Sequence, residues 1–152
     1  MSGKRERRRI AQAAALGARL VPPFRRSGLG GRGARPGFAE LVSWPRWPGL
    51  DDEARASVWA VAALVEARDA LAEEIDGSRL RDFAAQVGAE PLEAVLALPP
   101  GGRRALPEPG DLAAEGRELA EAALPPVLAG YLGIAAAGGD RDIISAAERI
   151  AR

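Results

Sequence analysis

The chain has 152 residues, 21 basic and 21 acidic side chains, no cysteine and no histidine. A chain of this length forms one domain and buries enough surface to fold without a disulfide or a metal. Without thiols or imidazoles it lacks disulfides, Cys- or His-ligated metal sites and the Ser-His-Asp and Cys-His triads. We therefore expect no cofactor, no metal and no catalytic residues.

Charge is divided unevenly along the chain. Residues 1–36 carry ten basic side chains and one acid, a net charge of +9, whereas residues 37–152 carry eleven Arg and twenty acids, a net charge of −9. The chain also has 33 Ala, and 20 Arg against one Lys. Since Ala, Gly, Arg and Pro have GC-rich codons, we expect a bacterial protein, and we expect it to be cytoplasmic.

The first 36 residues predict a basic arm. Residues 4–21 place Ile10, Leu16 and Leu20 on one side of a short, weakly amphipathic helix. Pro22 and Pro23 end it, and residues 25–37 combine Gly, Pro and Arg, which predicts a flexible linker. The basic side chains that we expect to contact an anionic surface are Lys4, Arg5, Arg7, Arg8, Arg9, Arg25, Arg26, Arg32 and Arg35.

Four interpretations of this arm remain open. It can be a targeting segment, a binder of nucleic acid or acidic lipid, a docking segment for an acidic protein partner, or a solvated charge run. The longest apolar stretches fall short of the 18 residues of a membrane span, so we expect no transmembrane segment. Gly28, Gly30 and Gly33 spell a dinucleotide fingerprint, but Pro22 and Pro36 exclude the strand and helix that such a site requires.

Residues 37–152 predict a helical domain that opens on a tryptophan-rich segment. Trp44, Arg46 and Trp47 alternate with two prolines, which favour an extended turn. These three residues can form an exposed anchor for a protein partner, because Trp and Arg are enriched at interface hot spots. Alternatively, Trp44 and Trp47 fold back on the next helix as a hydrophobic staple.

A long helix is predicted next, capped by Asp51 and continuing to Ile75. Its apolar face includes Val61, Leu64 and Ile75, and Arg68 interrupts that face. A guanidinium at that place needs a partner, so we expect a salt bridge to a carboxylate, with an anionic ligand as the alternative.

Two shorter helices are predicted at 79–87 and 92–98, with Gly88 between them. The pair resembles a helix-turn-helix over about 20 residues. Its second helix carries Glu90 and Glu93 and no base-reading side chain, so we expect the geometry of the motif without DNA reading.

Residues 99–110 are rich in Pro and Gly and predict a mobile linker, which can separate sub-lobes 37–98 and 111–152. Three more helices are predicted at 111–124, 127–137 and 140–152. The period-2 alternation of strands is missing. The sequence therefore predicts an all-α fold, an irregular bundle of five or six helices with a basic, Gly/Pro-rich N-terminal arm.

These features favour a non-catalytic accessory protein, an adaptor or assembly factor. Its helical body would bind a protein partner, and its arm would engage an anionic surface. The alternative is a nucleic-acid-associated protein in which the arm makes sequence-independent phosphate contacts. Oligomerisation is compatible with either function.

Overall fold

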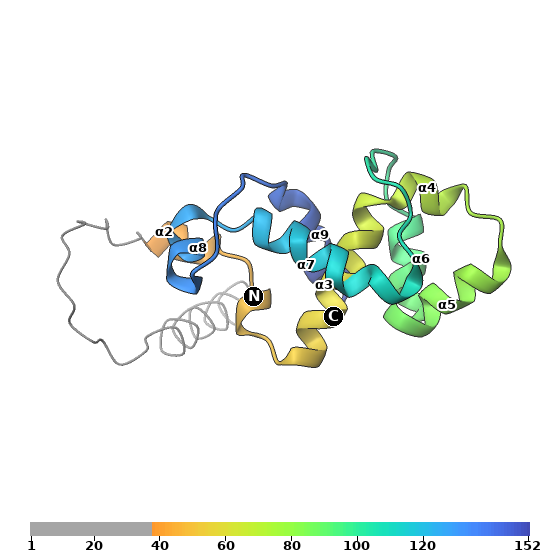
Figure 1. Cartoon of the computed structure of the whole chain (residues 1–152), viewed down its shortest axis with the longest axis horizontal. Coiled ribbons are helices and arrows are strands. Elements are labelled where there is room, and N and C mark those ends of the chain that lie inside the picture. Colours follow the sequence, from red (N-terminus) through yellow and green to blue (C-terminus); the bar gives the residue numbers. More distant parts are fainter. Residues whose placement is uncertain (1–37) are drawn as a thin grey trace, which may run out of the picture. The chain divides into compact units, whose positions relative to one another are not determined.

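The computed structural model describes residues 38–152 (Figure 1). The predicted helix, linker and anionic-surface residues of the arm lie outside this range. The described residues fall into two units, divided between Trp44 and Pro45. In the first unit the short helix α2 (Phe38–Val42) is followed by a turn in which the Ser43 hydroxyl and amide both donate to the Glu40 carbonyl.

The second unit, residues 45–152, is helical throughout. Its elements, in chain order, are the 3-10 helix η1 (Trp47–Gly49), α3 (Asp52–Glu66), α4 (Arg68–Ala72), α5 (Gly77–Val87), α6 (Ala89–Leu96), the 3-10 helix η2 (Pro109–Asp111), α7 (Leu112–Ala122), α8 (Pro126–Leu132) and α9 (Arg141–Ile150). The described range contains no strand, which confirms the predicted all-α class. It contains eight α-helices in place of the five or six that the sequence predicted.

The core of the second unit is built around α3. Val61, Leu64 and Val65 are almost completely buried, as the helical spacing predicted. Figure 1 shows α7 running beside α3, and α9 packs against α3 as well. The core therefore draws on helices from both of the suggested sub-lobes.

The predicted helix from Asp51 to Ile75 is interrupted at Ala67. In an unbroken helix the Glu66 carbonyl would accept a hydrogen bond from the amide four residues further along. It instead accepts N–H bonds from Arg103 and Arg104. α3 therefore ends at Glu66, and α4 is a separate helix of five residues. The prediction that Ile75 belongs to the core is wrong: this side chain is 96% exposed in the turn before α5.

Residues 99–110, predicted to be a mobile linker, are held to α3, α4 and α5 by hydrogen bonds. The Gly101 amide donates to both carboxylate oxygens of Asp69, at 2.9 and 3.1 Å. Further along, the guanidinium of Arg79 donates to the carbonyls of Leu106 and Pro107 and to the Glu108 carboxylate. A segment with its own anchors at both ends is ordered in spite of its Pro and Gly content.

Several helix ends follow local sequence signals. Asp51 accepts an N–H bond from the first turn of α3, as predicted, and Asp140 accepts one from the first turn of α9. Asp76 caps α5, since its carboxylate accepts hydrogen bonds from the amide and the hydroxyl of Ser78. α8 ends earlier than predicted, because Gly133 adopts a left-handed conformation (φ 70°) and the Ile134 amide donates to the Ala129 carbonyl, which forms a Schellman motif.

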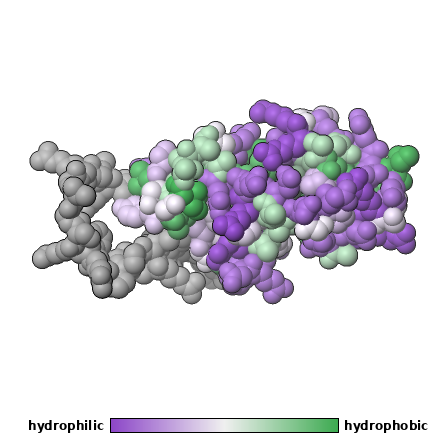
Figure 2. Space-filling model, in the orientation of Figure 1, coloured by the Kyte–Doolittle hydropathy of each residue, from purple (hydrophilic) through white to green (hydrophobic). Residues whose placement is uncertain are grey.

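Figure 2 shows polar residues over most of one face, with apolar residues in small groups between them. Within residues 38–152, the helices are too short or too polar to cross a lipid bilayer.

Candidate partner-binding site

The three residues predicted to bind a partner belong to two different units. Trp44 belongs to the first unit, where its amide donates to the Leu41 carbonyl. Arg46 and Trp47 open the second unit, and Trp47 is only 4% exposed. The Trp47 ring is thus occupied by contacts within the chain and offers little surface to another protein.

Trp47 is placed by η1 and by α9. Pro48 lies in the first turn of η1, where its fixed φ favours a helical turn and its missing N–H costs nothing. The backbone amides of Arg46 and Trp47 both donate to Oε1 of Glu148 on α9, the latter at 2.9 Å. This carboxylate fixes the segment against the core, so the Trp47 ring meets Trp59 edge to face, with centroids 5.5 Å apart.

Burial of Glu148 raises the pKa of its carboxyl above the ordinary 4.5. The N–H groups of Trp47 and Arg46 oppose this shift because they stabilise the charged form. Burial therefore destabilises the charged form of Glu148, and two backbone hydrogen bonds partly offset this effect.

Two arginines lie over the Trp59 ring. The Cζ atom of Arg55, one turn earlier on α3, is 6.0 Å from the ring centroid, and that of Arg117 on α7 is 5.7 Å away. Such distances are typical of cation–π contacts. We call Trp47, Arg55, Trp59 and Arg117 the arginine–tryptophan cluster.

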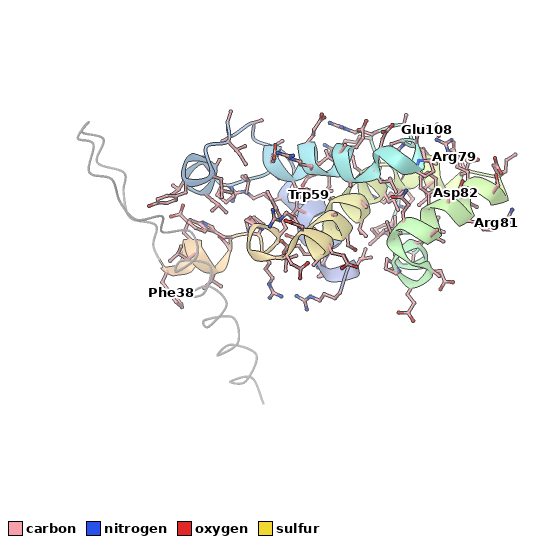
Figure 3. All side chains as sticks on the ribbon, turned by 60° about the horizontal axis from the view of Figure 1, so that its bottom comes forward. Phe38, Trp59, Arg79, Arg81, Asp82 and Glu108 are labelled. Carbon is pink, nitrogen blue, oxygen red and sulfur yellow. The ribbon has the colours of Figure 1, made fainter. Side chains whose placement is uncertain are left out.

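The close approach of α3 and α7 makes this cluster possible. Gly116 on α7 lies against the backbone of Trp59. The Trp59 backbone occupies the space that a Cβ atom on residue 116 would need. The neighbouring residue, Arg117, consequently reaches the Trp59 ring. Figure 3 shows Trp59 in the region where the two helices run together.

The hydrogen-bonding capacity of the cluster is only partly used. Nη2 of Arg55 donates to the Leu50 carbonyl at 2.8 Å and lies 3.5 Å from Asp52. Nε of Arg117 donates to Glu121 at 2.7 Å. Three buried donors lack an acceptor, namely Nε of Arg55 and Nε1 of Trp47 and Trp59. Each unsatisfied buried donor costs about 1–3 kcal/mol, and these three atoms are shielded from solvent.

Arg79 shows what a structural arginine looks like in this fold. Its two terminal nitrogens donate to two carboxylates and two carbonyls, and its Cζ atom lies 5.7 Å from the ring of Phe83, which is completely buried. Its Nε, like that of Arg55, is buried without an acceptor. Figure 3 shows Arg79 beside Glu108. By comparison, Arg117 has one protein acceptor and 60% of its side chain exposed.

Arg68 differs from the prediction of a salt bridge to a carboxylate. Its guanidinium donates to the carbonyls of Val65 and Pro99, at 2.6 and 2.8 Å. These bonds join the end of α3 to the segment after α6. They satisfy Arg68 with backbone groups and give it a structural role.

Two further carboxylates of the described residues accept hydrogen bonds from backbone amides. Among residues 38–152 there is no group of three or more carboxylates that could hold a metal ion. Asp69 and Asp76 have pKa values lowered by hydrogen bonds, Asp69 by the amides of Gly101 and Gly102 and Asp76 by Ser78. Both carboxylates are therefore held as structural acceptors.

Sequence reasoning missed Arg55, Trp59 and Arg117 as candidate site residues. The spacing of four between Arg55 and Trp59 on a predicted helix was an available signal, because such residues share a helix face. Arg117 had no comparable signal, because it meets Trp59 only through the packing of α7 on α3.

The chain was compared with models of protein families, with curated proteins and with solved structures, and none of them matched it.

Proposed function

We propose that this chain is a non-catalytic accessory protein, an adaptor or assembly factor whose helical body binds a protein partner. The observation that carries the proposal is the arginine–tryptophan cluster. Arg and Trp dominate the binding energy of many protein interfaces, because they combine a large contact area with directional donors. In this cluster the Arg117 side chain is 60% exposed and has one protein acceptor, Glu121.

The basic arm supplies a second contact in this proposal. Its net charge of +9 over residues 1–36 favours an anionic surface, whereas residues 37–152 carry a net charge of −9. Joining two weak contacts in one chain raises the overall affinity for an assembly that presents both surfaces. A cytoplasmic location is part of the same proposal.

The test is affinity capture from the native source with tagged full-length protein. We expect a protein partner in stoichiometric amount that is lost when Arg55 and Arg117 are both replaced by Ala. Replacing Arg104 by Ala is the matched control, since Arg104 pairs with Glu115 at 3.2 Å and is not among the arginines that stack on an aromatic ring. Recovery of no partner, or equal recovery with all variants, would count against the proposal.

The charge of the arm also favours a second candidate, a nucleic-acid-associated protein. In that case, binding to duplex DNA or single-stranded RNA should weaken steeply with added salt. It should also be lost when Arg5, Arg7, Arg8 and Arg9 are replaced by Gln in the full chain, and the cluster variants should leave it unchanged. Salt-independent or undetectable binding would remove this candidate.

A further inference from the structure

We propose that two copies of this chain pair through residues 122–139, which we call the uncharged loop, with the loop of one copy against the loop of the other. The proposal does not depend on the proposed function, and the arginine–tryptophan cluster is not part of this loop. Three observations support it, namely the closed geometry of the loop, the absence of charge on it and the opposite charges of the two parts of the chain.

The uncharged loop is closed at its two ends and has a small core of its own. The Gly139 amide donates to the Ala122 carbonyl at 2.7 Å, so the two ends lie side by side. They pack closely, because a Cβ atom on Gly139 would lie only 2.9 Å from backbone atoms of residues 122 and 123. Between the ends, Leu124, Leu128 and Ala129 are buried. The loop therefore has a defined shape and presents a defined surface.

The outward face of the uncharged loop is mostly apolar. Residues 122–139 contain no charged side chain, although residues 37–152 carry eleven Arg and twenty acids. Tyr131 on α8 is 62% exposed. The other exposed nonpolar side chains of the loop are those of Pro126, Ala135, Ala136 and Ala137. The central part of a protein interface is poor in charged residues and rich in Tyr, so the composition of this face is that of an interface with Tyr131 at its centre.

The charge distribution favours a second copy as the molecule that covers this loop. Residues 37–152 carry a net charge of −9, so two such bodies repel each other wherever their acids meet. When loop packs on loop, no carboxylate of the loops themselves has to be buried. The net charge of +9 on residues 1–36 makes the whole chain neutral, and it lets the basic region of one copy attract the acidic body of the other. A two-fold pair uses this attraction twice, because each copy gives and receives the same contacts.

The experiment measures the oligomeric state of the full-length protein by analytical ultracentrifugation over a range of concentrations. We expect the mass to rise from 15.9 kDa towards twice that value as the concentration increases. Tyr131→Asp should raise the dissociation constant of the dimer about tenfold or more, because it removes an aromatic contact and brings two like charges into the interface. The matched control is Ile75→Asp, since Ile75 is 96% exposed and lies outside the loop. This control should pair like the wild type.

Cross-linking gives a second measurement that does not require the pair to be disrupted. The chain has no cysteine, so Tyr131→Cys introduces a single thiol. In the proposed pair the two copies of residue 131 lie close together, and a short thiol-reactive cross-linker should join them as a covalent dimer. Ile75→Cys is the control, because this position is even more exposed than Tyr131 and should cross-link far less. If Tyr131→Asp changes the helical circular dichroism spectrum, the cross-linking result decides.

Three results would overturn the proposal. A full-length protein that stays monomeric at every concentration would mean that a second copy does not cover the uncharged loop. A folded Tyr131→Asp variant that pairs as well as Ile75→Asp would place the contact elsewhere, and so would equal cross-linking at positions 131 and 75. None of these results bears on the adaptor function, which is tested by the recovery of a partner protein.

Discussion

Gly116 on α7 lies directly against the backbone carbonyl of Trp59 on α3, where a single added methyl group would overlap the carbonyl oxygen and carbon. At this point the two helices pack backbone against backbone, and no side chain on α7 fits between them. Packing of the core and the position of Arg117 over the Trp59 ring both depend on it.

Replacing Gly116 by Ala should therefore destabilise the protein. The added Cβ meets backbone atoms rather than a movable side chain, so α7 must shift, at a cost of about 1–3 kcal/mol or more. Urea unfolding measures the loss. The control is Gly130→Ala in α8, where a Cβ would meet nothing within 4 Å. Since Ala favours helix over Gly, the control should be neutral or stabilising by roughly 0.5–1 kcal/mol. Equal stability of both variants would contradict the close approach.

The second prediction concerns the effect on stability of removing a buried and an exposed apolar side chain near α5. Phe83 is completely buried, whereas Ile75 is 96% exposed. Phe83→Ala should cost about 3–5 kcal/mol, because it removes buried surface and leaves a cavity. Ile75→Ala should change the free energy of unfolding by less than about 0.5 kcal/mol. A large effect at Ile75 would mean that it packs as the sequence had suggested.

A third prediction concerns the pH dependence that Glu148 adds to stability. Because its pKa is raised in the folded state, the proton is bound more tightly there than in the unfolded chain. The contribution of Glu148 is fully present below the ordinary value of 4.5 and is lost as the pH rises through the higher folded-state pKa. The stability of the wild type relative to Glu148→Gln should therefore decline across that interval and then level off. Urea unfolding of both proteins over a pH series measures it, and a difference that grows with pH would contradict the burial of this carboxylate.

Asp69 should behave in the opposite way. Its pKa lies below the ordinary 3.8 because the amides of Gly101 and Gly102 stabilise the carboxylate. The stability that it contributes is present above 3.8 and is lost as the pH falls through its folded-state pKa. Asp69→Asn should weaken the anchor and speed hydrogen exchange at Gly101, together with tryptic cleavage after Arg103.

The matched control for Asp69 is Asp82→Asn, since Asp82 is exposed on α5. This change should leave exchange at Gly101 and cleavage after Arg103 as in the wild type. If Asp69→Asn is equally silent, the hydrogen bonds from Gly101 do not hold the segment.

Local sequence signals were sufficient for much of the helical architecture. Asp51 and Asp140 cap helices, and Gly88 lies between two helices with a positive φ, because short-range hydrogen bonds and backbone sterics decide such positions. The stripe of Val61 and Leu64 was equally readable, because helical periodicity alone places them on one face.

The errors have a common physical cause. The helix break at Ala67 follows from the amides of Arg103 and Arg104, which take the Glu66 carbonyl. Residues 99–110 are held in place because Asp69 accepts a hydrogen bond from Gly101 and Arg79 donates one to Pro107. Asp69 and Arg79 belong to other elements of the fold. A window of sequence contains no information on bonds that close over some 30 residues.

What the sequence by itself determined is the helical class, the positions of most helix ends and the division of charge between residues 1–36 and 37–152. What only the tertiary structure decided is the candidate site. Trp47 and Trp59 lie in different elements, and Arg117 is far from both along the chain. They meet because α7 packs on α3 at Gly116 and Glu148 holds η1 against α9. Periodicity specifies which face of a helix is buried, but the choice of its neighbour depends on the free energy of packing the whole chain.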